Sequence, residues 1–455
     1  MPCRATIAQL SEILALSPKN LSEKALATLA TGISTDTRSL KPGEVFLALR
    51  GENFDGHKFV RTAVEKGAIA IITERDIDDK LPVDFPELRV ADTLKAYQEI
   101  ASWWRDRFSI PIVAVTGSFG KTTTKELIAA VLSTKGRVLK TQANYNNEIG
   151  VPKTLLELGP EYDFAVIEMA MRGRGQIAEL TQIAHPTIGV ITNVGTAHIG
   201  ILGTEEAIAQ AKCELLAEIS PTAVAILNQD NRLLMETAAT VWQGQTITYG
   251  LEGGDLRGEL INLETLRVEG LEFPLPLPGR HNAQNYLAAL AVAKVLQIDR
   301  TPLTAGLSVT LPEGRAKRYE LPNDIVILDE TYNAGLESML AALNLLAQTP
   351  GQRHIAVLGT MKELGEKSSQ LHRQVGAKAR DLNLDALLIL ADDPQAEAIA
   401  QGAKPLPSEC YQTHADVVER LKEVVKEGDR ILFKASHSVG LDRVVNEFRQ
   451  LVIGH

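Results

Sequence analysis

The feature that most constrains this chain is a glycine-containing turn between an apolar strand and a helix. Residues 115–126 read VTGSFGKTTTKE. The apolar run Ile112–Val115 predicts a buried strand and Thr123–Leu132 predicts a helix, so the chain must turn sharply between them. A strand, a glycine turn and a helix in this order are typical of a phosphate-binding loop. The alternative is an ordinary glycine turn with a surface lysine.

The residue types of this loop suit a nucleotide phosphate. Gly117 and Gly120 allow backbone N–H groups to approach phosphate oxygens, and the helix N-terminus adds a positive dipole end. Lys121 supplies a point charge for the terminal phosphates, and the Thr122 hydroxyl is placed to ligate Mg²⁺. The usual loop has four residues between its glycines and this one has two, so it is a variant. The expected nucleotide-binding residues here are Gly117, Ser118, Gly120, Lys121, Thr122 and Thr123.

Composition places the chain among globular proteins with several packed cores. It has 455 residues, 45% of them hydrophobic, which predicts about three domains by length. The net charge of -10 argues against non-specific nucleic-acid binding. Three widely spaced cysteines fit neither a disulfide framework nor a zinc site. No apolar run approaches the length needed to span a bilayer, and the N-terminus lacks a signal-peptide pattern, so we expect a cytoplasmic protein without membrane insertion.

The pattern of apolar segments predicts an α/β fold in three domains. Residues 1–108 are predicted to form a small α/β domain, with helices at Ile7–Leu16, Ala63–Gly67 and Ala91–Phe108 and strands at Val45–Leu49 and Ala68–Thr73. Residues 109–316 alternate strands and helices, which favours a mostly parallel sheet covered on both faces. Its expected strands are Ile112–Val115, Phe164–Glu168, Ile188–Thr192 and Ala223–Leu227, followed by a small antiparallel insertion at 245–278 and a helix at Asn282–Leu296.

Residues 317–455 alternate again and predict a Rossmann-like α/β domain. The expected strands are Ile325–Leu328, Ile355–Leu358, Ala386–Leu390 and Arg430–Phe433. The expected helices are Ser338–Ala347, Leu371–Asp381, Ala415–Lys426 and Leu441–Leu451. The segment contains no GxGxxG pattern, so a nicotinamide cofactor is not indicated.

Two polar side chains stand where strands of the central domain end. Glu168 closes one strand, and His198 follows the next in the sequence TNVGTAHIG. Carboxyl ends of parallel strands meet at one sheet edge, where a Mg²⁺ ligand or a water-positioning group is needed beside a phosphate loop. Lys212 lies on a helix that is expected to begin at Thr204, and spacing alone makes it a solvated charge.

These segments, taken together, resemble the Mur ligase family, the ATP-dependent amide-forming enzymes of peptidoglycan precursor synthesis. The resemblance runs from about residue 34 to about residue 445. It rests on the ordered blocks STDTRSLKPGEVFLALRGENFDGHKF, TGSFGKTTTKE, TQANYNNEIGVPKTLLEL, EMAMRGRGQIAEL, ITNVGTAHIG, AKCELL, PGRHNAQN, LDETYNAGLESMLAAL and VLGTMKELGEKSSQLHRQVG. The blocks are most similar to those of the member that adds a dipeptide.

The resemblance implies roles that spacing does not. It implies that Lys212 is carbamylated by CO₂ and joins Thr122, Glu168 and His198 as a Mg²⁺ ligand. It implies catalytic roles for Lys121, Lys212, His198 and Arg315. The ATP-binding residues would also include His281, Asn285, Arg315 and Asp329, and substrate would contact Ser34, Asp36, Arg38, Asn144, Asn146, Asn147, Tyr332 and Asn333.

The implied reaction is carboxylate activation by ATP. The γ-phosphoryl group would pass to UDP-N-acetylmuramoyl-tripeptide, and D-alanyl-D-alanine would displace phosphate from the acyl phosphate, in a monomeric enzyme. Three alternatives remain: a sister ligase that adds a diamino acid, a folylpolyglutamate-synthase-like ligase, and a non-catalytic nucleotide switch. The DNPR block of the diamino-acid-adding relative is absent, which argues against that sister. Residues 1–108 argue against the folate enzyme, because they resemble a domain that binds a nucleotide sugar.

The chain departs from the dipeptide-adding pattern at three places in residues 317–455. Glu330 replaces the second Asp of a DDxYNANP block, and Gly335-Leu336 replaces its Asn-Pro. Thr360 stands where GDM is common, and KASHSVGLDRVV replaces a KGSR-like block. The departures concern amine selectivity more than reaction type.

Overall fold

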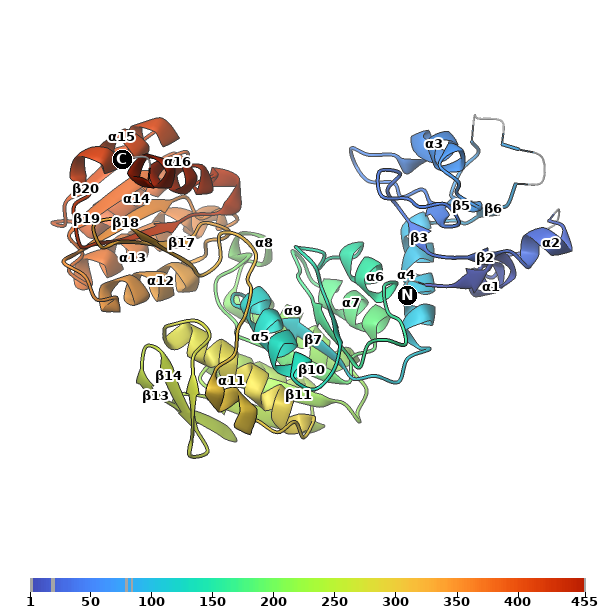
Figure 1. The fold of residues 1–455 in the computed structure, drawn as a ribbon, viewed down its shortest axis with the longest axis horizontal. Coiled ribbons are helices and arrows are strands. Elements are labelled where there is room, and N and C mark those ends of the chain that lie inside the picture. The colour runs from blue at the N-terminus through green and yellow to red at the C-terminus, as the bar shows by residue number, and fades with distance from the viewer. Residues whose placement is uncertain (1–2, 18–20, 78–80, 83–84, 454–455) are drawn as a thin grey trace.

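The protein consists of three α/β parts arranged in a row, with the central part between the other two (Figure 1). The computed structural model describes residues 3–17, 21–77, 81–82 and 85–453. Two small sheets lie between residues 5 and 89, a nine-stranded sheet between 112 and 274, and a six-stranded sheet between 317 and 434. The predicted α/β fold class is confirmed, whereas the division at residues 108 and 316 stays a prediction.

The N-terminal part is built on a four-stranded parallel sheet in the order β3-β4-β5-β6. The predicted strands and helices are present with shifted ends: most are shorter, and the helix predicted at Ala63–Gly67 begins earlier, at Val60, and ends at Glu65. The strands are β1 (Ala5–Thr6), β2 (Leu29–Ala30), β3 (Ile33–Ser34), β4 (Val45–Leu47), β5 (Ala70–Thr73) and β6 (Glu87–Arg89). The helices are α1 (Ile7–Ile13), α2 (Glu23–Leu26), η1 (Gly56–Phe59), α3 (Val60–Glu65) and α4 (Thr93–Arg105). Helix α4 leads into the central part (Figure 1).

The central sheet has the strand order β15-β14-β13-β12-β11-β10-β7-β9-β8, and its strands from β12 to β8 are parallel. These strands are β7 (Ile112–Thr116), β8 (Val138–Lys140), β9 (Phe164–Glu168), β10 (Ile188–Ile191), β11 (Val224–Asn228) and β12 (Gln245–Gly250). The helices are α5 (Lys121–Ser133), α6 (Gly150–Leu155), α7 (Gln176–Ala184), α8 (Ile199–Leu202), α9 (Glu205–Glu218), α10 (Arg232–Val241) and α11 (Arg280–Val295).

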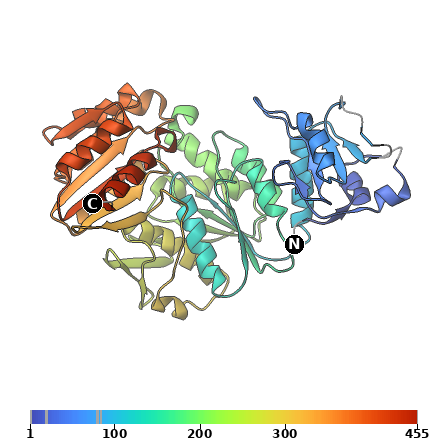
Figure 2. The same ribbon diagram turned by 45° about the horizontal axis from the view of Figure 1, so that its top comes forward.

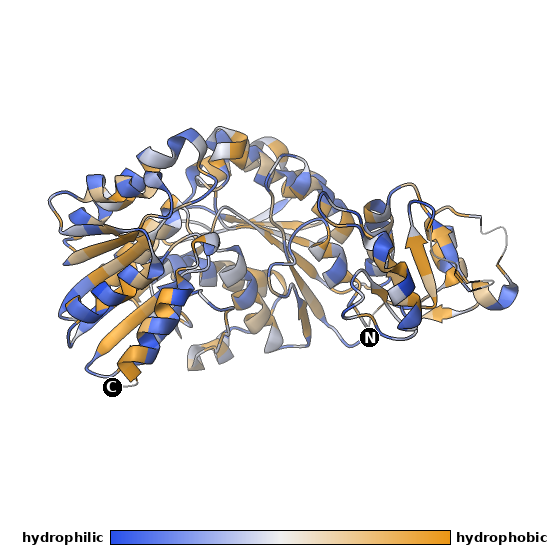
Figure 3. Cartoon of the chain, turned by 90° about the horizontal axis from the view of Figure 1, so that it is seen from above, coloured by the Kyte–Doolittle hydropathy of each residue, from blue (hydrophilic) through white to orange (hydrophobic). Residues whose placement is uncertain are grey.

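Strand β7 shows why helices must cover both faces of this sheet. Ile112 and Ala114 belong to the core that contains α7 and α9, while Val113 and Val115 belong to the core that contains α5 and α11. Successive side chains of a strand point to opposite faces, so a wholly apolar strand needs apolar partners on both sides. In Figure 3 most of the strands are accordingly hydrophobic, and the helices alternate between hydrophobic and hydrophilic residues.

The prediction of an antiparallel insertion over residues 245–278 is partly wrong. Its first segment is β12, which pairs in parallel with β11 and extends the main sheet. The alternation Thr246-Ile247-Thr248-Tyr249 suits a half-buried strand, and Tyr249 is buried. Only β13 (Leu256–Asn262), β14 (Thr265–Val268) and β15 (Leu271–Pro274) form an antiparallel meander.

The third part is a six-stranded sheet in the order β16-β17-β21-β18-β19-β20, with β16 antiparallel at its edge. The strands are β16 (Lys317–Leu321), β17 (Ile325–Glu330), β18 (Arg353–Gly359), β19 (Ala386–Leu390), β20 (Ser408–Tyr411) and β21 (Asp429–Lys434). The helices are α12 (Leu336–Gln348), α13 (Ser368–Asp381), α14 (Ala398–Ala403), α15 (His414–Val424) and α16 (Asp442–Ile453), with short turns η3 (Gly365–Lys367), η4 (Pro394–Glu397) and η5 (His437–Val439). The turn η2 (Thr301–Ala305) precedes this part and contacts β15 of the central sheet.

Figure 2 shows that the third part lies against one end of the central part, away from the N-terminal sheet. A search of the described residues finds no helix with the length and hydropathy of a membrane span.

Candidate functional site

The glycine turn between β7 and α5 is tight enough to require both of its glycines. Gly120 has φ +76°, and a Cβ there would lie 2.6 Å from Asn285 Oδ1. A Cβ on Gly117 would lie 1.9 Å from Thr192 Oγ1. Side chains are therefore excluded at both positions, which leaves the backbone of the loop open to a ligand.

Residues after β10 hold this loop in shape. The Asn193 Oδ1 atom accepts a hydrogen bond from Phe119 N at 3.0 Å, and Asn193 Nδ2 donates to Phe119 O at 3.0 Å. Gly195 N donates to Ser118 Oγ at 2.9 Å. The Ser118 side chain, which was predicted to bind nucleotide, therefore also fastens the loop to the neighbouring strand end. Such a preformed loop does not need to reorganise when a phosphate binds.

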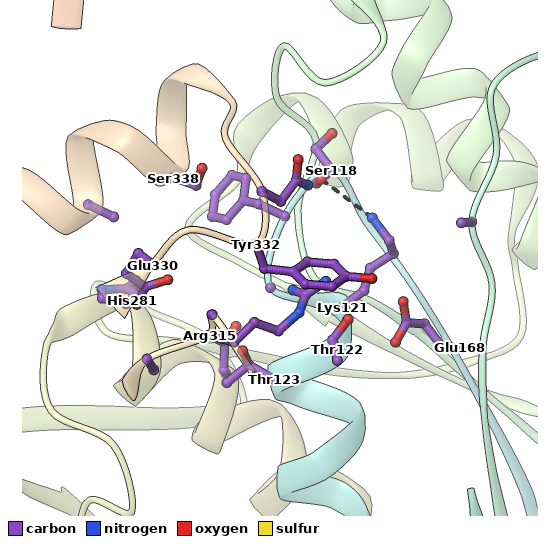
Figure 4. A pocket seen from close by; sticks show the side chains of 18 of the residues that line it. Ser118, Lys121, Thr122, Thr123, Glu168, His281, Arg315, Glu330, Tyr332 and Ser338 are labelled. Atoms are coloured by element: carbon purple, nitrogen blue, oxygen red, sulfur yellow. Dashed lines mark hydrogen bonds between the residues drawn. The ribbon is translucent and has the colours of Figure 1, made fainter. Parts of the chain in front are cut away.

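Lys121, the first residue of α5, points back over the loop (Figure 4). Its Nζ donates to Gly117 O at 2.8 Å. Burial lowers the pKa of Lys121, the charge of Glu168 opposes this effect, and the guanidinium of Arg315 adds to it. The ammonium thus lies between the loop carbonyls and a carboxylate, where a terminal phosphate would give it a further partner.

Glu168 ends β9 as predicted and has one oxygen without a partner. Its Oε1 accepts a hydrogen bond from Asn146 Nδ2 at 2.7 Å. The buried Oε2 accepts no hydrogen bond from any of the described residues, and its nearest cation is Lys125 Nζ at 3.9 Å. A buried carboxylate oxygen without a donor is costly unless a ligand completes it.

This arrangement fits a magnesium ion held partly by substrate. Glu168 and Thr122 line the same cavity and offer the hard oxygen ligands that Mg²⁺ prefers. Among residues 3–17, 21–77, 81–82 and 85–453, no group of three or more His, Cys, Asp or Glu side chains could hold a metal by itself. Mg²⁺ commonly binds through one or two carboxylates together with phosphates and water.

His198 and Lys212 lie near Lys121 but differ in access. Burial, followed by the charges of Lys121 and Lys212, lowers the pKa of His198 to about 4. The imidazole is therefore neutral at pH 7, and its Nδ1 lies 2.8 Å from Glu363 Oε2. Lys212 is 1% exposed, and burial lowers its pKa well below the ordinary value, with a further contribution from Lys121. The structure thus contradicts the solvated charge that spacing alone gave Lys212.

The third part supplies the opposite wall of the cavity. The Arg315 guanidinium lies 4.0 Å from the centre of the Tyr332 ring, which itself stacks on His437. Figure 4 shows Arg315 and Tyr332 side by side above Thr122. Lys434 Nζ donates to Asn333 O at 2.8 Å.

Lys434 was missed by sequence reasoning. It ends β21, burial lowers its pKa, and it lines the same cavity as Lys121. The signal that could have identified it is the one that identified Glu168: a charged residue directly after an apolar strand, at the carboxyl edge of a parallel sheet.

The start of α11 closes the cavity on the remaining side. Asn285 Oδ1 accepts a hydrogen bond from Thr124 Oγ1 at 3.2 Å, which ties α11 to α5. Burial, with a further contribution from Lys434, lowers the pKa of His281 to about 4. The enclosed volume is about 260 Å³. The predicted residues that line it are Ser118, Gly120, Lys121, Thr122, Thr123, Asn144, Asn146, Glu168, His198, His281, Asn285, Arg315, Tyr332 and Asn333.

The other predicted site residues lie outside this lining. Asn147 Oδ1 accepts a hydrogen bond from the backbone N of Gly150, the first residue of α6. Asp329 lines an adjoining cavity, where its Oδ1 accepts from the Thr331 hydroxyl at 2.7 Å. Gly117 belongs to the loop but does not line the cavity. Lys212 lies in α9.

Ser34 ends β3, and Asp36 and Arg38 follow it, in the N-terminal part at the far end of the row (Figure 1). Arg38 Nη2 donates to Asp36 Oδ2 at 2.7 Å, and this bond lowers the pKa of Asp36 to about 2. The Arg38 side chain is 88% exposed, so it remains accessible. The substrate role of the three residues stays a prediction.

Three family profiles match the chain in order. They are the Mur ligase family catalytic domain at residues 30–104, the Mur ligase middle domain at 115–293 and the Mur ligase glutamate ligase domain at 314–437.

Relatives of known function and structure match over nearly the whole chain. The UDP-N-acetylmuramoyl-tripeptide–D-alanyl-D-alanine ligase of Synechocystis is 60% identical over 95% of this chain and 94% of its own length. The Escherichia coli ligase of the same name is 34% identical over 98% of each chain. Crystal structure I of MurF from Acinetobacter baumannii superposes with a TM-score of 0.88 at 32% identity over 99% of both chains. MurF from Thermotoga maritima in complex with ADP gives a TM-score of 0.82 at 31% identity, covering 92% of this chain and 97% of that chain.

Proposed function

The chain belongs to the Mur ligase family, and on that premise we propose that it joins D-alanyl-D-alanine to UDP-N-acetylmuramoyl-tripeptide at the expense of ATP, in peptidoglycan precursor synthesis. The observation that carries this proposal is the 60% identity, over 95% of the chain, to a relative named for that reaction. The cavity between the phosphate loop and the third part supports it, because both walls present cations where phosphoryl charge would develop.

The reaction divides into two balanced steps. A terminal carboxylate oxygen of the tripeptide attacks the γ-phosphorus of ATP, and the bond to the bridging oxygen breaks to release ADP. The amine of D-alanyl-D-alanine then attacks the acyl phosphate, loses a proton and expels phosphate. Lys121 and Arg315 lie on opposite walls of the cavity and would offset the repulsion between carboxylate and triphosphate.

We assign the metal site to Mg²⁺ bound by Thr122, Glu168, His198 and a carbamylated Lys212. When bound, Mg²⁺ supplies charge neutralisation on the phosphate oxygens. The orphaned Glu168 Oε2 and the neutral His198 ring support this set. Burial, with a further contribution from the charge of Lys121, lowers the pKa of Lys212 well below its ordinary value. This favours the neutral amine, whose nitrogen can bond to the carbon of CO₂ and release a proton. The product is an anionic ligand in place of a cation.

The remaining contacts are assigned by position. We place the base and ribose of ATP against His281, Asn285 and Asp329, where α11 meets the third part. We place the tripeptide chain along Asn144, Asn146 and Asn147, and its uridine nucleotide at Ser34, Asp36 and Arg38. Tyr332 and Asn333 would face the incoming amine. Both substrates and ATP are water-soluble small molecules, and we propose a monomeric, cytoplasmic enzyme.

Mass spectrometry of the product tests this function. The protein is incubated with ATP, Mg²⁺, the nucleotide tripeptide and D-alanyl-D-alanine, and we expect a product heavier by the dipeptide less one water, together with stoichiometric ADP. ADP release without an amide product would favour the nucleotide-switch alternative.

A second assay separates the sister activities. It compares kcat/KM for D-alanyl-D-alanine with that for meso-diaminopimelate offered with the nucleotide dipeptide. We expect D-alanyl-D-alanine to be preferred. Because Gly335, Leu336 and Thr360 depart from the dipeptide-adding pattern, we also expect other residues to be tolerated at one position of the dipeptide. A preference for diaminopimelate would move the protein to the sister activity.

A further inference from the structure

One carboxylate of the third part reaches across to the central part and contacts a predicted metal ligand. Glu363 lies between β18 and η3, and its Oε2 is 2.8 Å from His198 Nδ1. The same residue accepts a hydrogen bond through its backbone, because Gly200 N donates to Glu363 O at 3.1 Å. Both the side chain and the main chain of Glu363 therefore meet the turn that carries His198.

The two segments approach each other closely. A Cβ on Gly200 would lie 2.6 Å from Gly365 N, so a side chain cannot be accommodated there without moving backbone. A second carboxylate of the third part, Glu337, accepts hydrogen bonds from Thr196 N at 2.7 Å and Thr196 Oγ1 at 3.1 Å. Residues 196–200 are thus held from both ends by the third part.

The His198 backbone needs such support. Its φ is +66°, in the left-handed region that a residue with a side chain rarely adopts. The conformation persists only when its surroundings determine it, and here the surroundings include another part of the chain.

We propose that Glu363 is a positioning residue that makes the metal-binding geometry of His198 depend on the seating of the third part, which means its contact with residues 196–200 of the central part. By accepting a hydrogen bond from Nδ1–H, Glu363 fixes the tautomer in which the Nε2 lone pair is free for a metal. Carboxylates that bond to the far nitrogen of a ligating histidine act in this way in metal sites generally. The inference rests on the proposed role of His198 as a metal ligand.

Coupling of this kind is reciprocal. If seating of the third part improves metal affinity, metal binding must favour the seated arrangement by the same free energy. The proposal therefore predicts that ligation begins only when the amine-binding part has closed over the nucleotide, which would protect an acyl phosphate from water.

Metal binding in the presence of ADP tests the role of the carboxylate. Mn²⁺ affinity is measured by electron paramagnetic resonance for the wild type, Glu363→Ala, Glu363→Gln and the control Glu366→Ala, which removes an exposed carboxylate three residues away. We expect Glu363→Ala to weaken Mn²⁺ binding by about 10- to 100-fold, the usual effect of losing such a partner. Glu363→Gln retains an oxygen acceptor and should recover most of the affinity, and Glu366→Ala should match the wild type. Equal affinities for Glu363→Ala and Glu366→Ala would overturn the proposal.

A second variant disturbs the contact between the two parts without removing the Glu363 carboxylate. Gly200→Ala keeps Glu363 but places a methyl group against the Gly365 backbone, whereas Gly173→Ala adds a methyl group with no atom within 4 Å. In the wild type we expect Mg²⁺ and ADP to produce a compaction that small-angle X-ray scattering can detect. We expect Gly200→Ala alone to weaken Mn²⁺ binding and to abolish that compaction. Wild-type affinity and compaction in Gly200→Ala would refute the coupling.

These measurements remain distinct from a failure of the proposed function. They record metal affinity and shape rather than ligation, so they can succeed if the amine substrate is wrong. They can also fail while the amide product still forms.

Discussion

Similar polar residues lie at the carboxyl edges of the central and third sheets, but the two edges differ in whether these residues have hydrogen-bond partners. At the central edge, Glu168 Oε2 and Thr116 Oγ1 are buried, and none of the residues that the structure describes hydrogen-bonds to them. At the third edge, Lys362 Nζ lies 2.9 Å from Asp392 Oδ2, and Thr360 Oγ1 donates to the same carboxylate. Lys434 is likewise satisfied by the Asn333 carbonyl.

This difference in unpaired polar atoms indicates which sheet edge binds a ligand. A buried polar atom without a partner costs about 1–3 kcal/mol, so an edge that keeps two such atoms is completed by something that binds there. At the third edge Lys362, Asp392 and Lys434 are paired within that part, although the buried Nε atoms of Arg315 and Arg449 beside it have no hydrogen-bond partner among the described residues. We infer that the nucleotide and metal belong to the central sheet, and that the third sheet closes over them.

Removing the phosphate-loop cation should cause the largest loss of activity. Lys121→Ala takes away a preorganised charge, so we expect ligation to fall by about 10³-fold or more, in keeping with the loss of several kcal/mol at such sites. The melting temperature should stay close to that of the wild type, because within the described part of the chain the ammonium hydrogen-bonds to the loop carbonyls of Gly117 and Ser118 alone. The measurement is kcat/KM, with Lys135→Ala, an exposed lysine after the same helix, as the control. Turnover near that of the control would remove Lys121 from the catalytic residues.

The second largest effect should come from Lys212, which tests whether the central edge is completed by a covalent carbamate. We expect Lys212→Ala to lose at least about 10²-fold in kcat, as for other metal-site residues, and to recover part of it with an added short carboxylate. In a well-ordered crystal equilibrated with CO₂ at neutral to alkaline pH, density should show three extra atoms on Nζ. An unmodified lysine together with an active Lys212→Ala enzyme would contradict the carbamate.

A smaller effect is expected at the third edge. Lys434 is 3% exposed and holds the 330–333 turn through Asn333 O. Lys434→Met keeps the stem but removes the donor, and we expect kcat/KM for the amine to fall by about 10-fold, the size expected for one or two hydrogen bonds to a charged group. Affinity for ATP should change less than threefold, as measured by calorimetry. A larger loss of ATP affinity than of amine turnover would show that the two edges share the nucleotide.

The same contrast explains what could be predicted from the sequence. The phosphate loop and Glu168 were predictable because their signals are local: a glycine turn after an apolar strand, and a charge at a strand end. The contact between Glu363 and His198 joins residues 165 positions apart and has no local signal. The burial of Lys212 likewise depends on how α9 packs, which spacing along one helix does not specify.

Errors in the predicted fold have similar causes. The strands β8 and β20 were missed because three or four residues give too little alternation to detect. Strand β12 was assigned to an antiparallel insertion because its pairing with β11 skips the whole of α10. Sequence patterns identify the elements, but pairing between distant elements is decided by tertiary packing.

The smallest expected effect concerns stability, and it asks whether the third edge is self-sufficient. His372 is fully buried, its Nε2 accepts a hydrogen bond from Met361 N at 2.9 Å, and its Nδ1 lies 2.8 Å from Ser368 O. Both contacts require the neutral tautomer with the proton on Nδ1, and burial lowers the pKa of His372 below its ordinary value. The unfolded chain, with a histidine pKa of about 6.5, therefore takes up the proton first. Stability is full above that pH and falls as the pH drops from there toward the folded pKa.

We accordingly expect the free energy of unfolding to decrease more between pH 7 and pH 5.5 in the wild type than in His372→Gln, whatever the offset between them at pH 7. The measurement is urea denaturation at each pH, followed by circular dichroism. His185→Gln serves as a surface control, because the His185 side chain is half exposed. If His372→Gln keeps the wild-type slope, the neutral imidazole does not stabilise the turn beneath Thr360. The third edge would then depend on its ion pairs alone, and its stability should respond to salt rather than to pH.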